Sequence, residues 1–186
     1  MRFLAIDFET ANAKRSSICA FGYALFEEGS LVTSGVDLCK PEPNYYDFWN
    51  TRIHGITYED TCLLGGFEDL VQKIDAFWPD FIVAHNASFD ISCLRSWCDS
   101  RGYVYPDYPY ICTVVTSRSL HANMSHALDA MCRLYDIPLN HHEAGSDAMA
   151  CGLLMQKFLQ MTHSTSADSL CQTLGISMGK IRRTPG

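Results

Sequence analysis

The chain has 186 residues, of which 47% are hydrophobic and 19% charged. This length suits one domain with a sizeable core, and the composition excludes an intrinsically disordered chain. The formal net charge of −7 argues against a protein that holds phosphates with Lys and Arg alone, although divalent cations bound at clustered carboxylates would reverse the local sign.

Nine cysteines are spread along the chain, without a Cys-x-x-Cys pair. A structural zinc site is therefore not supported, and most of the cysteines lie in apolar stretches, as reduced thiols of cytosolic proteins do. The apolar run at the N-terminus ends at Asp7, too early to span a bilayer. We expect a soluble, cytoplasmic protein without a membrane partner.

Three strands are predicted near the N-terminus. Residues 2–8 and 18–27 are apolar or alternating, and residues 31–39 follow a turn at Glu28-Gly29-Ser30. We expect these strands to form an antiparallel meander.

The rest of the chain alternates helices with short apolar strands. In chain order we predict an irregular segment with short helical turns at 40–66, a helix at 67–78 ended by Pro79, a buried strand at 81–84, a helix at 88–100 and a loop at 103–110. These are followed by a last strand at 110–114, a helix through Tyr135 with Ser125 as its N-cap, and a long helix from Ala144 or Gly145 to about Leu159.

This order predicts an α/β fold with a mixed five-stranded sheet flanked by helices. Residues 1–162 are expected to form the domain. Residues 163–186 are expected to be a tail with a short helix near 166–174 and a basic end at Lys180, Arg182 and Arg183. That end could contact nucleic acid or a partner, or be a solvated terminus.

Two acids stand at the end of the first predicted strand. Asp7 and Glu9 point to the same face, about 7 Å apart along the chain. Their charges repel each other and are partly desolvated, and a divalent cation between them would remove that penalty. The pair alone fits equally well a strand that ends in water.

Two further acids lie near the starts of later helices. Asp90 shares a helix stripe with apolar residues three, four and seven positions later, and Asp147 shares one with Cys151, Leu154 and Phe158. Each carboxylate therefore points toward the core, although each alone could simply stabilise a helix N-terminus. Four carboxylates that converge above one sheet edge need cations, and hard oxygen ligands favour Mg²⁺ or Mn²⁺ over Zn²⁺.

The same residues form three short motifs: Asp7-x-Glu9, Asn86-x-x-Phe89-Asp90 and His142-x-x-x-x-Asp147. In order and spacing they resemble the exonuclease motifs of the DEDDh family, which has the ribonuclease H-like fold. That family includes the epsilon subunit and PolC-type exonuclease domains of bacterial DNA polymerase III, and ribonuclease T. The segment His54-Gly55-Ile56-Thr57 also resembles polymerase-linked members. The resemblance covers roughly residues 1–160.

The fifth motif residue separates two subfamilies. The sister group has a tyrosine four positions before the last aspartate, where this chain has Glu143, while His142 stands five before. The histidine type is therefore indicated, and the adjacent His141 is expected to be a structural or solvated neighbour.

The resemblance implies an enzyme, a 3′–5′ exonuclease that hydrolyses the terminal phosphodiester with two Mg²⁺ or Mn²⁺ ions. It implies that Asp7, Glu9, Asp90 and Asp147 are the catalytic metal ligands, with Asp7 bridging, and that His142 is the general base rather than a ligand.

Likeness to the family also suggests substrate contacts. Thr10 and the backbone around Phe8 would touch the terminal sugar, and His54, Asn86 and Phe89 would line its pocket. The side chain of Phe8 is expected in the core. Lys14 and Arg15 could meet phosphates or be a solvated loop.

Several alternatives stay open at this point. The chain could be a catalytically silent binding module on the same fold, a metal phosphoesterase for small molecules, or an exonuclease that trims RNA rather than DNA, since that choice depends on contacts to the 2′ position. The expected partner is a nucleic acid with a free 3′ end. A DNA polymerase or a second copy of the chain could also bind, and DNA repair, trimming and proofreading roles all remain possible.

Overall fold

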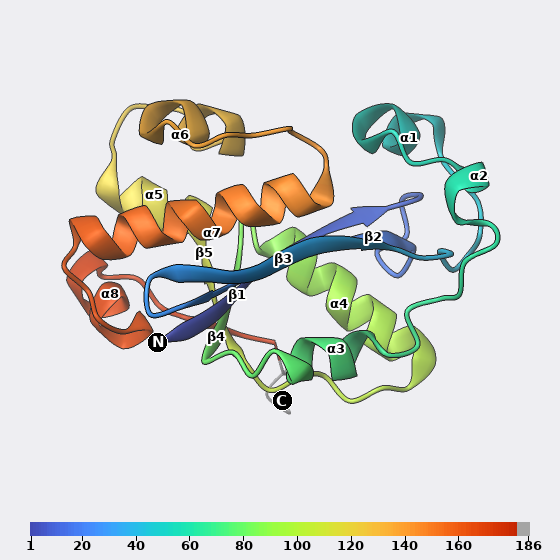
Figure 1. The fold of residues 1–186 in the computed structure, drawn as a ribbon, viewed down its shortest axis with the longest axis horizontal. Helices are drawn as coiled ribbons and strands as arrows, with labels where there is room; N and C mark the ends of the chain where they lie inside the picture. Colours follow the sequence, from blue (N-terminus) through green and yellow to red (C-terminus); the bar gives the residue numbers. More distant parts are fainter. Residues whose placement is uncertain (182–186) are drawn as a thin grey trace.

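The computed structural model describes residues 1–181, so Arg182 and Arg183 of the predicted basic end lie outside the described residues. Within this range the chain forms one six-stranded sheet with helices on both faces (Figure 1). The predicted α/β class is confirmed, whereas the predicted number of five strands is wrong by one.

The sheet has the strand order β3-β2-β1-β4-β5-β6. Its strands are β1 (Arg2–Thr10), β2 (Ile18–Glu27), β3 (Ser30–Leu38), β4 (Phe81–Ala84), β5 (Pro109–Cys112) and β6 (Gly179–Lys180). The first three form the predicted antiparallel meander, β4 and β5 run parallel to β1, and β6 is antiparallel to β5.

The helices of the described range are α1 (Phe48–His54), α2 (Tyr58–Thr61), α3 (Leu70–Ala76), α4 (Ser88–Arg101), α5 (Thr113–Leu120), α6 (Leu128–Tyr135), α7 (Ala144–Met161) and α8 (Ala167–Leu174). None of them is long and apolar enough to cross a membrane.

The alternation of β1 divides the core into two layers. Leu4, Ile6 and Phe8 face α3 and α4 in one apolar cluster. Phe3 and Ala5 point to the opposite face, where they belong to a cluster with residues of α7 and α8. Because side chains alternate along a strand, Asp7 and Glu9 continue the second stripe toward α7.

The long helix α7 crosses the sheet in Figure 1, and α6 lies on the side of α7 that faces away from the sheet. Leu154 and Phe158 pack with Leu128 and Met131 of α6 in a third cluster. The buried side of α7 also carries Asp147 in its first turn, so packing of this helix on the sheet fixes one of the predicted acids.

The tail beyond residue 162 packs on the rest of the chain. Its predicted short helix is α8, which contributes Leu170 and Cys171 to the cluster of β1 and α7. The additional strand β6 pairs with β5, and Ile181 is completely buried.

Several boundaries differ from the sequence-based expectation. The helix predicted at 67–78 is shorter, since α3 spans Leu70–Ala76. The last predicted strand ends at Cys112, and residues 113–120 form α5. The β-branched run Thr113-Val114-Val115-Thr116 favours a strand locally, so tertiary packing overrides its propensity. The N-cap of α6 is Ala127 rather than the predicted Ser125, and the helix begins at Leu128.

Candidate active site

The acid pair of β1 lies beneath the start of α7. Asp7 is paired in register with Gly22 of β2. A Cβ atom on Gly22 would lie only 1.9 Å from the carbonyl oxygen of Ala144, the first residue of α7. Glycine at this position therefore allows the helix to start directly above Asp7.

Asp147 completes a group of three carboxylates. Glu143 caps α7, because its side chain accepts hydrogen bonds from the backbone N–H groups of Gly145 (3.1 Å) and Ser146 (2.8 Å). One turn into the helix, Asp147 is 5% exposed. One carboxylate oxygen each of Asp7, Glu9 and Asp147 lie within 4.8 Å of one another, which is close enough for a shared cation.

Asp90 reaches the same place from α4. It is 1% exposed, and its Oδ1 accepts a hydrogen bond of 3.0 Å from the backbone N–H of Phe8. This contact fixes Asp90 against β1 between the two acids of the pair. The predicted convergence of the four carboxylates is thus present in the structure.

Burial and mutual repulsion disfavour the ionised acids. Burial, followed by the charges of Asp90, Glu9 and Asp147, raises the pKa of Asp7 well above its ordinary value. Burial and the nearby carboxylates raise the pKa of Glu9 to about 8. Burial also raises the pKa of Asp90 to about 7, partly offset by the Phe8 N–H.

In the part of the chain that the structure describes, the compensating positive charge near these acids is small: His141 contacts Asp147, and the charge of Arg15 acts on Asp90. In residues 1–181 neither Lys nor Arg forms an ion pair with any of the four. Grouping ionised carboxylates away from water costs free energy unless cations compensate their charge. Hard divalent cations prefer several oxygen ligands of this kind. The donor set therefore fits Mg²⁺ or Mn²⁺.

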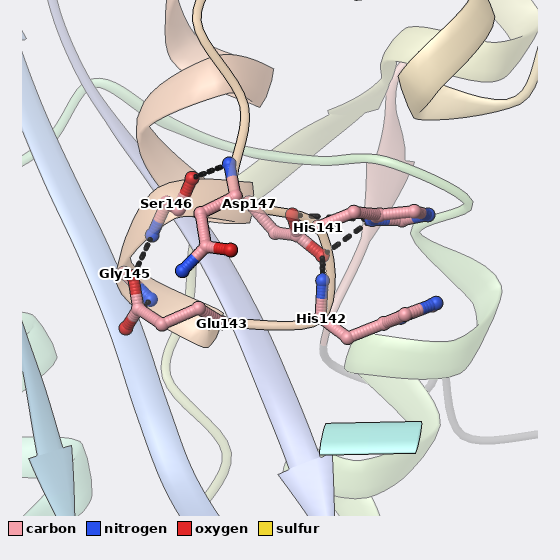
Figure 2. Close-up of polar contacts among 7 residues, drawn as sticks. His141, His142, Glu143, Gly145, Ser146 and Asp147 are labelled. Carbon is pink, nitrogen blue, oxygen red and sulfur yellow. Dashed lines mark hydrogen bonds and ion pairs between the residues drawn. The ribbon is translucent and has the colours of Figure 1, made fainter. Parts of the chain in front are cut away.

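Both histidines before α7 lie against Asp147 (Figure 2). The backbone N–H of His142 donates to Asp147 Oδ2 over 3.0 Å, and His141 Nδ1 lies 3.1 and 3.3 Å from the two carboxylate oxygens. The two rings stack with centroids 3.8 Å apart and project to the same side, away from α7.

The turn that creates this arrangement is at His142, which has a left-handed φ of 69°. The spacing of the motif indicated His142, whereas the partner of the aspartate is the ring of His141. His141 is thus more than a solvated neighbour, because its contact holds the Asp147 carboxylate in place. The His142 ring does not hydrogen-bond to Asp147 and lines the adjoining cavity.

A cavity of about 750 Å³ opens over the acids. It brings together eight of the ten predicted site residues, namely Asp7, Phe8, Glu9, Asn86, Phe89, Asp90, His142 and Asp147. Phe8 is almost fully buried and stacks on Phe21, as expected for a core side chain. Phe89 is half-buried, and the guanidinium group of Arg15 lies 4.2 Å from its ring centre.

The other two predicted residues lie beside the cavity. The Thr10 carbonyl accepts a hydrogen bond from Asn50 Nδ2 (2.8 Å) and lies 3.2 Å from His54 Nε2. These contacts attach α1 to the end of β1. Burial, followed by the nearby charge of His142, lowers the pKa of His54, and the contact with the Thr10 carbonyl partly offsets this. Helix α1 therefore lies next to the cavity that holds the acids.

Sequence reasoning missed four cavity residues with polar or polarizable side chains: His85, Arg118, Met124 and His126. His85 follows the buried strand β4 directly, and this position at the carboxyl end of a parallel strand was a signal that could have found it. The other three come from α5 and from the loop before α6, and no local pattern marks them.

A family model described as an exonuclease matches residues 4–175. Among curated proteins, the PolC-type DNA polymerase III of Thermotoga maritima is 29% identical over 174 residues, or 91% of this chain. That of Halalkalibacterium halodurans is 34% identical over 166 residues, or 85% of the chain. The chain spans only 13% and 11% of the length of these relatives.

Solved structures agree in fold. Exonuclease X in complex with 5′ overhanging duplex DNA has a TM-score of 0.71 at 19% identity, with 94% of this chain and 99% of that chain covered. The nuclease domain of 3′hExo, a DEDDh family member bound to rAMP, has a TM-score of 0.76 at 14% identity, with 88% and 94% covered. These findings confirm the resemblance predicted from the motifs, the ribonuclease H-like fold class and the nuclease class of enzyme.

Proposed function

This chain belongs to the exonuclease family, and from that premise we propose that it is a metal-dependent 3′–5′ exonuclease that releases nucleoside 5′-monophosphates. The observation that carries the proposal is the convergence of two buried carboxylates, two half-buried carboxylates and two histidines on one open cavity. DNA is the proposed substrate, because the curated relatives are DNA polymerases.

The four acids would hold two divalent cations. Asp7, Glu9 and Asp147 offer oxygens close enough for one ion, and Asp90 lies beside Asp7 for the second. Such ions stabilise the attacking and leaving oxygens of a phosphodiester hydrolysis.

The histidines have separate tasks in this proposal. A ring nitrogen of His142 takes the proton from the attacking water, since an imidazole has a suitable basicity near neutral pH. The ring of His141 holds the carboxylate of Asp147, and the left-handed turn at His142 brings both groups to the same oxygens.

The remaining predicted contacts would hold the terminal nucleotide. Phe89 offers a half-buried ring for stacking, next to Asn86 in the cavity wall. Thr10 and His54, joined at the end of β1, stand where a sugar next to Glu9 would be.

The first test is a digestion panel of 5′-labelled single- and double-stranded DNA and RNA, with free and blocked 3′ ends, in Mg²⁺ and in Mn²⁺. We expect stepwise shortening of DNA from a free 3′ end and no reaction in EDTA. Preferential shortening of RNA would assign the enzyme to RNA trimming. Metal-independent binding without shortening of any oligonucleotide would instead identify a silent binding module.

The second test is His142→Asn. Asparagine tolerates the left-handed backbone at this position better than alanine does. Loss of a general base predicts a fall in kcat of about 100-fold or more, with Mg²⁺ binding and thermal stability preserved.

The matched control is His163→Asn, which replaces an exposed histidine of left-handed φ (52°) just beyond the far end of α7. This variant should keep full activity. Near-normal turnover in His142→Asn would refute the role of the ring as base.

A further inference from the structure

A second groove continues from the catalytic cavity. It has a volume of about 410 Å³ and runs between α5 and the segment 176–179. The cavity and the groove share Asn86, Val114 and Arg118 in their linings. Whatever occupies the cavity therefore has a continuous path into the groove.

The wall of this groove opposite α5, formed by residues 176–179, is attached to β5 and α4. Tyr110 of β5 is paired with Gly179 of β6, and a Cβ atom on Gly179 would lie 2.1 Å from the tyrosine ring. Arg95 of α4 donates hydrogen bonds of 2.8 Å to the carbonyl oxygens of Lys180 and Ile181. Both contacts fix the segment 176–181, so the groove is formed without a ligand.

The charge of the groove comes from Arg118. Within the described part of the chain, it is the only Lys or Arg side chain that lines either the cavity or the groove. Arg118 is exposed and forms no ion pair in residues 1–181. A guanidinium group in this situation can donate to phosphate oxygens in bidentate fashion.

The other lining groups suit nucleotides. Ser88 and Asn86 offer polar side chains, whereas Val114, Val115 and Met178 offer apolar surface. A polynucleotide strand presents this combination, because it has anionic phosphates along one side and flat apolar base faces along the other.

We propose that this groove binds the nucleotides on the 5′ side of the scissile bond in a single strand, and that Arg118 contacts their phosphate. The inference rests on the proposed exonuclease function and extends it to substrate length. The terminal nucleotide occupies the cavity beside Phe89, the scissile phosphate lies at the acids, and the strand leaves past Asn86 and Arg118.

The experiment compares two substrates that differ only beyond the scissile phosphate. The p-nitrophenyl ester of thymidine 5′-monophosphate reaches the acids but has no upstream nucleotide. Oligothymidylates of two, four and twelve nucleotides fill the groove to increasing extent. For the native chain, kcat/KM should rise from the dinucleotide to the tetranucleotide and then level off.

Arg118→Gln should lower kcat/KM on the twelve-nucleotide substrate about tenfold or more, as expected for loss of a charge-assisted hydrogen bond. For this variant, the slope of log(kcat/KM) against log[salt] should become less steep by about 0.7, which is the contribution of one phosphate contact on a single strand. Hydrolysis of the p-nitrophenyl ester should fall by a smaller factor than hydrolysis of the oligonucleotide, because the ester has no upstream phosphate.

Arg118 also borders the cavity, so a second variant reports on the groove alone. Ser177→Trp introduces a bulky ring at an exposed groove residue that does not line the cavity. It should abolish the gain from the dinucleotide to the tetranucleotide while the ester is still hydrolysed. The control Arg133→Gln removes the same charge from an exposed arginine of α6 and should leave both substrates unaffected.

Equal losses on ester and oligonucleotide, or an unchanged length dependence in both variants, would overturn the groove proposal and leave the proposed function intact. If the native chain hydrolyses neither substrate with Mg²⁺ or Mn²⁺, the proposed function itself fails, and the groove proposal fails with it.

Discussion

Removal of divalent cations should make the stability of this protein fall as the pH rises. Burial and neighbouring carboxylates raise the pKa of Glu9 from 4.5 to about 8. Between these values the folded chain holds a proton that the unfolded chain has released. The free energy of unfolding therefore decreases with increasing pH over this window, opposite to the behaviour of a salt-bridged acid.

The size of this effect follows from the shift. One pKa unit corresponds to about 1.4 kcal/mol, so Glu9 alone should cost about 3 kcal/mol between pH 5.5 and pH 8. Asp90, with a pKa raised to about 7, acts in the same direction. A bound Mg²⁺ ion compensates the ionised acids, and at 100 times its Kd it stabilises the folded chain by about 2.7 kcal/mol.

The assay is urea unfolding, followed by tryptophan fluorescence, at four pH values from 5.5 to 8.5 in EDTA and in excess Mg²⁺. We expect a declining stability in EDTA and a much flatter profile in Mg²⁺. Glu9→Gln should reduce the decline and stabilise the metal-free chain at pH 8. The control Glu59→Gln, at an exposed acid of α2, should leave the profile unchanged.

A stability in EDTA that is constant or increases over this pH range would refute the reasoning. Such a profile would mean that the four carboxylates are separated or solvated in the protein, and the case for a cation site would be lost with it.

Three further variants test how the fold holds the site. Gly22→Ala places a methyl group against the Ala144 carbonyl and should cost about 1–3 kcal/mol, with reduced turnover because α7 must move. Leu170→Ala should cost about 2–5 kcal/mol, since this fully buried side chain joins α8 to the core. Glu143→Ala removes the cap of α7 and should cost about 1 kcal/mol and weaken Mg²⁺ binding at Asp147. Urea unfolding and calorimetric Mg²⁺ titration measure these effects.

Each of these variants has an outcome that contradicts its premise. An unaltered stability of Gly22→Ala would mean that α7 does not approach the sheet closely. An unaltered stability of Leu170→Ala would mean that the segment after residue 162 is a separate tail. Undiminished Mg²⁺ affinity in Glu143→Ala would separate the helix cap from the metal site.

Local patterns predicted most of the elements because the signals act over short distances. The alternation of β1 and the apolar stripes of α4 and α7 placed four acids on inward faces, where the structure has them. Helix α5 was missed, since its β-branched start favours a strand when considered alone. The two-residue strand β6 is too short to leave a periodic pattern.

The histidines show where sequence spacing is insufficient. His141 and His142 are neighbours, and the motif indicated only the second. The left-handed backbone of His142 decides that the ring of His141 and the N–H of His142 both bond to Asp147. A single φ angle of this kind depends on the packed turn around it, so spacing could not predict it.

The sequence by itself determined the identity of the site: four acids and a histidine in an order that indicates cation-dependent chemistry, on elements whose periodicity turns them inward. Only the tertiary structure decided how these groups are held and what surrounds them. The contact of Asp90 with the Phe8 N–H, the closeness of α7 permitted by Gly22, and the groove at Arg118 each join segments remote in the chain. The physical reason is that side-chain periodicity is a local property, whereas distances between elements arise from close packing of the whole core.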